Sequence, residues 1–262
     1  MTTIRFPSAF ISHGGGPCFF MDWDPPHEWD RLREALASLV AGLPATPRAI
    51  VMVTAHWETE VFEIAAGSAP ELIYDYWGFP AHTYELTHRA PGDPALATEI
   101  DALLTAAGIA HRVDPTRGWD HGVFIPMKVM DPDATIPIVA VSVRSDFDPL
   151  AHLELGRALA PLRDRGVFIV GSGFSFHNFA KFGAPEAQIF DDWLQEVMTS
   201  DAVTRWDALA HWTDGPTARI AHAREEHLLP LMVAAGAADD VPARRFFSGR
   251  VLNTPTSCWL FD

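Results

Sequence analysis

The chain has 262 residues, of which 48% are hydrophobic and 20% charged, and its formal net charge is −15. This length and composition fit one compact globular domain spanning residues 1–262. The negative charge argues against nucleic acid and anionic membranes as partners, because both require a basic footprint. The sequence shows no secretory signal or membrane-spanning run, and its two cysteines form no disulfide pattern, so we expect a cytoplasmic protein.

The first half of the chain alternates between strand and helix patterns. Residues 8–12 form an apolar, strand-like run that leads into His13. Residues 28–43 have helical periodicity, and a second apolar run, 49–55, leads into His56. Residues 72–84 are rich in aromatic residues, Gly and Pro, which is typical of a loop.

The second half continues the same alternation. We expect helices at 93–107, 150–164, 186–199 and 217–235, and strands at 60–66, 135–143, 166–171, 244–247 and 257–261. The pattern predicts an α/β fold in which a mostly parallel central sheet is flanked by helices. In such sheets, ligands bind at the carboxyl ends of the strands.

Three histidines occupy such positions. His13 and His56 follow their strands directly, and His177 follows the strand at 166–171 by a few residues. Imidazole is the commonest metal ligand in proteins. Together these placements predict a metal site on one rim of the sheet, whereas any one of them alone would more often be structural.

Two further histidines have informative neighbours. His121 follows Asp120, which is a suitable cap for a short helix beginning at that point. His227 lies in the predicted helix 217–235, three residues before Pro230, so we expect a kink there. The other histidines are interpreted as surface or structural residues.

These motifs, taken in order, match a known family. They are His-Gly-Gly-Gly-Pro at 13–17, Ala-His-Trp at 55–57, Tyr-Asp-Tyr-Trp-Gly-Phe-Pro at 74–80, Trp-Asp-His-Gly at 119–122, Gly-Ser-Gly at 171–173 with His-Asn at 177–178, and Glu-His-Leu-Leu-Pro at 226–230. The chain resembles the class III (LigB-like) extradiol ring-cleavage dioxygenases, and most closely their DOPA-dioxygenase-like branch. Each motif alone is weak, and their order and number carry the resemblance.

The resemblance implies a mononuclear Fe(II) site in which His13, His56 and His227 bind the metal. His177 matches the family's acid/base histidine, and His121 its substrate-contacting histidine. Better-known members supply a glutamate as the third ligand, where this chain has His227. Three histidines also suit Zn(II), with His177 as a possible fourth ligand.

The resemblance further implies the reaction and its small-molecule partners. A catechol and O2 would bind at the metal, and His177 would take a catechol proton. His121 would stabilise negative charge developing on oxygen. The product would be a ring-opened semialdehyde. The sequence specifies neither the catechol nor the oligomeric state.

Three other interpretations remain open. A serine hydrolase would use the His-Gly-Gly-Gly run as an oxyanion loop and Ser175, Asp214 and His227 as a triad. A zinc hydrolase would use His13, His56 and His227 with a metal-bound hydroxide. A non-enzymatic binding protein on the same scaffold is the third, because a fold does not determine a function.

Overall fold

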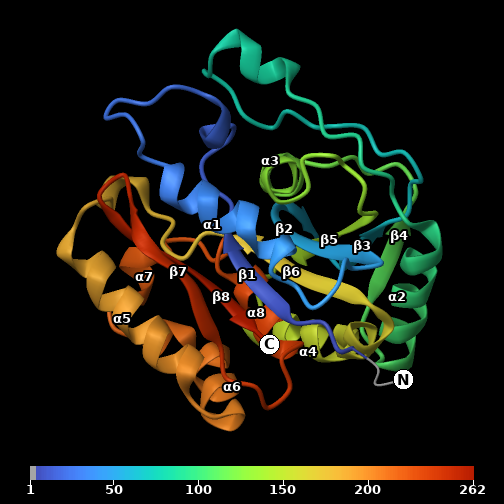
Figure 1. The fold of residues 1–262 in the computed structure, drawn as a ribbon. Coiled ribbons are helices and arrows are strands. Elements are labelled where there is room, and N and C mark those ends of the chain that lie inside the picture. Colours follow the sequence, from blue (N-terminus) through green and yellow to red (C-terminus); the bar gives the residue numbers. More distant parts are fainter. Residues whose placement is uncertain (1–3) are drawn as a thin grey trace.

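The computed structural model describes residues 4–262, which form an α/β fold around one eight-stranded sheet (Figure 1). In chain order the strands are β1 (Ser8–Ser12), β2 (Ala49–Thr59), β3 (Phe62–Ala65), β4 (His111–Asp114), β5 (Ile138–Arg144), β6 (Val167–Gly173), β7 (Arg244–Val251) and β8 (Thr254–Phe261). In space their order is β4-β3-β5-β2-β6-β1-β8-β7. The four central strands, β5, β2, β6 and β1, are mutually parallel, so their carboxyl ends share one edge of the sheet.

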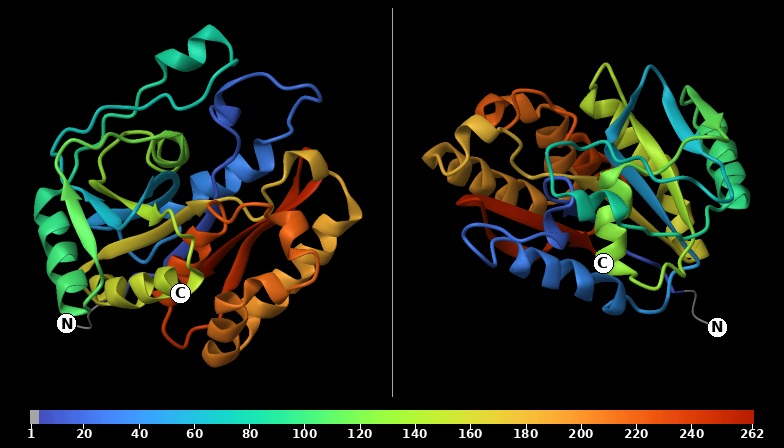
Figure 2. Two further views of the ribbon diagram at one scale, coloured as in Figure 1. Left: turned by 180° about the vertical axis from the view of Figure 1, so that it is seen from behind. Right: turned by 90° about the horizontal axis from the view of Figure 1, so that it is seen from above.

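Helices cover both faces of this sheet. They are α1 (Asp30–Ala41), α2 (Pro94–Ala106), α3 (His121–Met130), α4 (Pro149–Leu159), α5 (Pro185–Thr199), α6 (Ala202–Ala210), α7 (Ala218–Ala221) and α8 (Leu229–Gly236). Helices α1 and α3 lie over one face, and α2, α4 and α8 over the other, as the views from behind and from above show (Figure 2). Helices α5, α6 and α7 pack beside β8.

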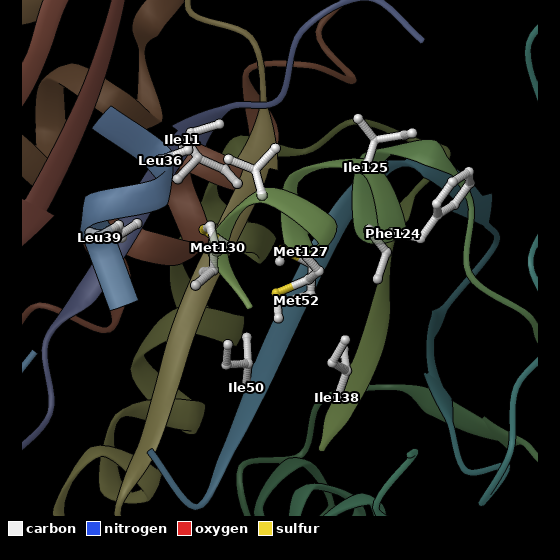
Figure 3. Packing of buried hydrophobic residues seen from close by; sticks show 14 of the residues in the cluster. Ile11, Leu36, Leu39, Ile50, Met52, Phe124, Ile125, Met127, Met130 and Ile138 are labelled. Atoms are coloured by element: carbon white, nitrogen blue, oxygen red, sulfur yellow. The ribbon is translucent and has the colours of Figure 1, made fainter. Parts of the chain in front are cut away.

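Strand alternation separates the two halves of the core. Ile50 and Met52 of β2 belong to the same core cluster as Leu36 of α1 and Met127 of α3, and Met52 lies beside Met127 (Figure 3). The intervening residues of the same strand face the helices on the opposite side. Because β2 is buried on both faces, its sequence is an almost continuous apolar run.

The predicted α/β fold with a mostly parallel sheet is confirmed, and most elements lie within a few residues of their expected bounds. The predicted helix 217–235 is wrong. It divides into α7 and α8, because Pro230 lies in the first turn of α8, where its missing N–H costs nothing. His227 therefore lies in a turn before a helix and not at a kink within one.

The second strand also differs from the prediction. It continues past His56 to Thr59, but between Val53 and Glu58 four of its residues face the single residue Ser142 of β5. Such an irregularity bends a strand and redirects its side chains, often beside an active site. Here it contains His56. Within residues 4–262, no helix has both the length and the apolar character needed to cross a membrane.

Candidate metal centre

Three imidazole rings meet at the carboxyl edge of the central strands. The Nε2 atom of His56 lies 3.1 Å from Nε2 of His13 and 3.2 Å from Nε2 of His227. All three are predicted metal ligands. His13 and His227 are buried, with exposed fractions of 1% and 5%. The structure therefore brings together residues that lie up to 214 positions apart in the chain.

Each ring is delivered by a different element. His13 directly follows β1, and its backbone N–H donates to the Gly173 carbonyl of the neighbouring strand β6. His56 comes from the irregular part of β2. His227 lies against β6, where its carbonyl accepts the N–H of Phe174.

Close packing of the His227 segment depends on glycine in β6. A methyl group at Gly173 would lie 2.1 Å from the His227 carbonyl oxygen, and one at Gly171 would lie 2.0 Å from that of Pro230. Only a residue without a side chain allows this approach. The Gly-Ser-Gly motif therefore makes room for the turn that carries the third histidine.

Hydrogen bonds fix the tautomers of His13 and His227. Nδ1 of His227 lies 2.9 Å from Oε1 of Glu226, and an ionised carboxylate can only accept, so Nδ1 carries the proton. The Ser172 hydroxyl donates to the Gly122 carbonyl at 2.5 Å, and therefore accepts from Nδ1 of His13 at 3.0 Å. Both rings thus direct an unprotonated Nε2 toward the centre.

His56 follows the same rule through a longer contact. Its Nδ1 lies 3.5 Å from Oδ2 of Asp75, which favours the proton on Nδ1 and leaves Nε2 free. Three facing lone pairs with no proton between them repel one another unless a cation lies among them. Two nitrogens at about 2.1 Å and at right angles on one ion would be roughly 3 Å apart, which matches the observed spacing. The site therefore fits a divalent metal.

Burial keeps these rings neutral. Desolvation, followed by the neighbouring histidines, lowers the pKa of His13 and His227 well below the usual value. Burial and His121 lower the pKa of His56 to about 3. A neutral imidazole is the form that binds metal, so the three nitrogens are available at neutral pH.

His177 lies beside the three rings and shares a carboxylate with one of them. Its ring stacks on that of His227 with centroids 3.5 Å apart, and its Nδ1 lies 3.2 Å from Oε1 of Glu226. Burial by itself raises the pKa of Glu226, but the hydrogen bond from His177 leaves it below the usual value. The ionised carboxylate holds the His177 proton on Nδ1 and leaves its Nε2 able to accept a proton.

His121 begins α3, where a short helix was expected. Both its backbone N–H and its Nδ1 lie 2.9 Å from Oδ1 of Asp75. Burial raises the pKa of Asp75, yet the hydrogen bond and charge of His121 hold it below the usual value. Asp120 precedes the helix without capping it through its side chain, and instead accepts hydrogen bonds from Thr54 and Arg117 at 2.8 Å.

Two of these carboxylates were not among the predicted site residues. Asp75 lies within the aromatic loop motif at 74–80, and its spacing from His56 and His121 gives no signal in the sequence. Glu226 adjoins a predicted ligand, but an acidic pair such as Glu225-Glu226 is more often solvated. Only the folded structure shows that each of these carboxylates lies next to two imidazoles.

A cavity of about 530 Å³ lies in front of the histidines. His56, His121, His177 and His227 line it, as do the glycines of the turn after His13. The aromatic loop contributes Tyr76, Trp77 and Phe79 to its wall, as expected for a substrate pocket.

The serine hydrolase constellation is not assembled. The Ser175 hydroxyl is buried and accepts the backbone N–H of Ser257 at 3.0 Å. Asp214 is exposed, and the carboxylate that meets Nδ1 of His227 is Glu226. The predicted triad residues therefore do not form a nucleophile, base and orienting acid.

Comparison with known proteins agrees with this geometry. The family model described as the catalytic LigB subunit of aromatic ring-opening dioxygenase matches residues 7–253. The chain belongs to this family. A dioxygenase of Hapsidospora irregularis is 39% identical, with 94% of this chain and 82% of that protein covered. The 4,5-DOPA dioxygenases of Beta vulgaris and Escherichia coli K12 are 37% and 33% identical, with 88% and 91% of this chain and 86% and 88% of theirs covered.

A solved structure has the same fold over nearly the whole chain. The crystal structure of an uncharacterized protein from Escherichia coli K12 superposes with a TM-score of 0.81 at 29% identity, covering 98% of this chain and all of that one. This chain is a LigB-family extradiol dioxygenase of the DOPA-dioxygenase-like branch, as its motifs predicted, and no comparison supports a hydrolase. LigB extradiol dioxygenases depend on a metal.

Proposed function

We propose that residues 1–262 act as one catalytic domain that opens a catechol ring beside its diol, using O2 and one Fe(II) ion bound by His13, His56 and His227. The observation that carries this proposal is the convergence of three unprotonated Nε2 atoms beside an aromatic cavity. The relatives named as 4,5-DOPA dioxygenases support a catechol as the substrate class.

The ligand set supports iron in a facial arrangement. Three protein nitrogens on one side leave the remaining positions free for substrate and O2. A zinc ion could bind the same nitrogens, with His177 as a fourth ligand, because zinc readily accepts three histidines. Zinc does not change its oxidation state, so we assign the reaction to the iron form.

When bound at these nitrogens, the metal supplies Lewis acidity and sites where the catechol oxygens and O2 are held together. His177 then acts as the base, because its Nε2 is free and its Nδ1–H donates to Glu226. The Glu226 carboxylate stabilises the imidazolium that forms when Nε2 takes the catechol proton.

His121 lines the same cavity, beside His56. Asp75 orients its ring through Nδ1 and would stabilise the positive charge of a protonated His121. In that form its Nε2–H donates to a substrate oxygen that gains negative charge. The aromatic walls exclude water, which strengthens these electrostatic interactions.

The test is an assay with protein purified without oxygen and reconstituted with Fe(II). We expect catechols to give a visible ring-opened product with one O2 consumed per turnover. Parallel samples without O2, and with Zn(II) replacing iron, should be inactive. Activity of the zinc form without O2 uptake, or formation of a muconic diacid, would contradict the proposal.

A further inference from the structure

The wall of the active-site cavity is unusually rich in aromatic side chains. Eight of its lining residues are Trp, Tyr or Phe, and Leu252 adds a further apolar surface. They come from three parts of the chain: the turn after β1, the aromatic loop and the segment after β6. The aromatic residues are Trp23, Trp29, Tyr76, Trp77, Phe79, Phe174, Phe179 and Phe182.

The cavity is much larger than a catechol. An apolar cavity of about 150 Å³ is enough to hold a benzene molecule, whereas this one measures about 530 Å³. After one ring is placed against the histidines, there remains space for a substituent at least as large as a second ring. The cavity is therefore large enough for a catechol that carries a bulky substituent.

The wall contains no permanently charged cation for a substrate carboxylate. Among the described residues that line the cavity there is no Lys or Arg, and the ionisable groups are Asp75, Tyr76 and the histidines beside the proposed metal site. Arg117 is stacked over Trp57 at 4.9 Å and paired with Asp120, while Arg224 is paired with Glu58. Lys181 is exposed and does not line the cavity. A substituent carboxylate that lies against the aromatic wall, away from the histidines, would be desolvated without a partner, which is costly.

Two aromatic side chains stand at the mouth of the cavity. Trp77 is 85% exposed and Phe179 is 66% exposed, although both line the cavity. Large exposed apolar side chains next to a cavity are typical of a binding surface. A second ring on the substrate would cover them through stacked or edge-to-face contacts.

We infer, on the basis of the function proposed above, that the preferred substrate is a catechol bearing an uncharged, apolar substituent such as a second aryl group. The amino acid DOPA and catechols with a carboxylate side chain are poor substrates. The aromatic wall, the excess volume and the lack of Lys and Arg among the described lining residues all favour this class.

The test compares 3-(3,4-dihydroxyphenyl)propanoate with its primary amide, which has the same shape but no negative charge, in the Fe(II) enzyme. We expect kcat/KM for the amide to exceed that for the acid by about tenfold or more, as for an unpaired buried charge. L-DOPA should behave like the acid, and 4-(2-phenylethyl)catechol should be better than the amide. If kcat/KM for the acid or for L-DOPA equalled that for the amide, the inference would be overturned, while the dioxygenase function would stand. If the enzyme opened none of these catechols, the proposed function itself would be rejected.

Charge variants make the comparison sharper. Phe179→Lys places a cation at the mouth, and we expect it to raise the acid-to-amide ratio of kcat/KM severalfold. Val203→Lys is the matched control, because Val203 is 80% exposed on α6 and does not line the cavity. The same increase in both variants would indicate a general effect of net charge and would contradict a cavity-specific one.

Discussion

A single carboxylate oxygen, Oε1 of Glu226, accepts hydrogen bonds from two imidazoles with different roles. It fixes the proton of His227, the proposed ligand, and that of His177, the proposed base, on their Nδ1 atoms. Both rings then present Nε2 toward the cavity. Partners that orient metal-binding histidines commonly matter almost as much as the ligands themselves. In this proposal Glu226 orients imidazoles and its neighbour His227 binds the metal, although both residues lie in one short turn.

At this scale the first prediction concerns the three proposed ligands. Replacement of His13, His56 or His227 by Ala removes one of three nitrogens, of which that of His56 lies 3.1 Å from His13 and 3.2 Å from His227. We expect each variant to lose most of its metal, measured by elemental analysis after reconstitution and desalting. Full metal occupancy in all three variants would refute the ligand assignment.

The second prediction concerns His177. His177→Ala removes the proposed base, and we expect kcat to fall by about 10²–10⁴-fold while metal content stays substantial. Turnover at saturating Fe(II) and metal content are measured on the same sample. Near-normal turnover would exclude the role as a base, and complete loss of metal would make His177 a ligand.

At the scale of elements, β6 organises the site on both of its faces. Ser172 holds His13 from one side, and Gly171 and Gly173 admit the turn before α8 on the other. Alternation along a strand explains this arrangement, since successive residues point to opposite faces. A strand that contributes none of the proposed metal ligands therefore positions two of the three.

This role of β6 can be tested without altering a ligand. In Gly173→Ala the new methyl group would lie 2.1 Å from the His227 carbonyl oxygen, so the turn must move. We expect metal affinity to fall by about 10–100-fold, comparable with the loss of an orienting partner. The measurement is titration of the metal-free protein with Fe(II).

The matched control is Gly15→Ala in the turn after His13. A methyl group there has no neighbour within 4 Å, and the residue does not have a positive φ. This variant should bind metal like the unaltered protein. Equal affinities for all three proteins would mean that β6 does not position His227.

The elements that the sequence predicted well have strong periodicity, and those it missed do not. The apolar runs that became β1, β2, β5 and β6 are buried on both faces and were recognised from composition. Strand β4 was missed because it is short and half-exposed, and α6 because it is short. The carboxylate partners of the histidines were missed because they depend on contacts between distant segments, which no local pattern encodes.

Over the whole molecule, buried neutral histidines link stability to pH. His152 belongs to α4, and its Nε2 accepts the backbone N–H of Arg144 at 3.1 Å. It is fully buried, and desolvation lowers its pKa to about 4. Its usual pKa is near 6.5, so between these values the unfolded chain binds a proton that the folded chain does not.

Acid therefore destabilises the folded protein through His152. The stabilising contribution of neutral His152 is complete above pH 6.5 and is lost as the pH falls toward 4, by on the order of 3 kcal/mol. We expect His152→Gln to lose less unfolding free energy than the unaltered protein over this range, measured by urea denaturation of metal-free samples. The acidic groups are common to both proteins and titrate equally in them. If the unfolding free energy changed with pH at the same rate in both, His152 would contribute nothing to the pH dependence.

The three histidines of the metal centre stand at positions 13, 56 and 227, and the third is seated on a strand that ends at Gly173. During synthesis from the N-terminus, the first two can emerge long before the third exists. No nascent chain shorter than 227 residues contains all three histidines. All three proposed ligands can therefore meet on one metal only near the end of synthesis, and a product truncated before residue 227 lacks one of them.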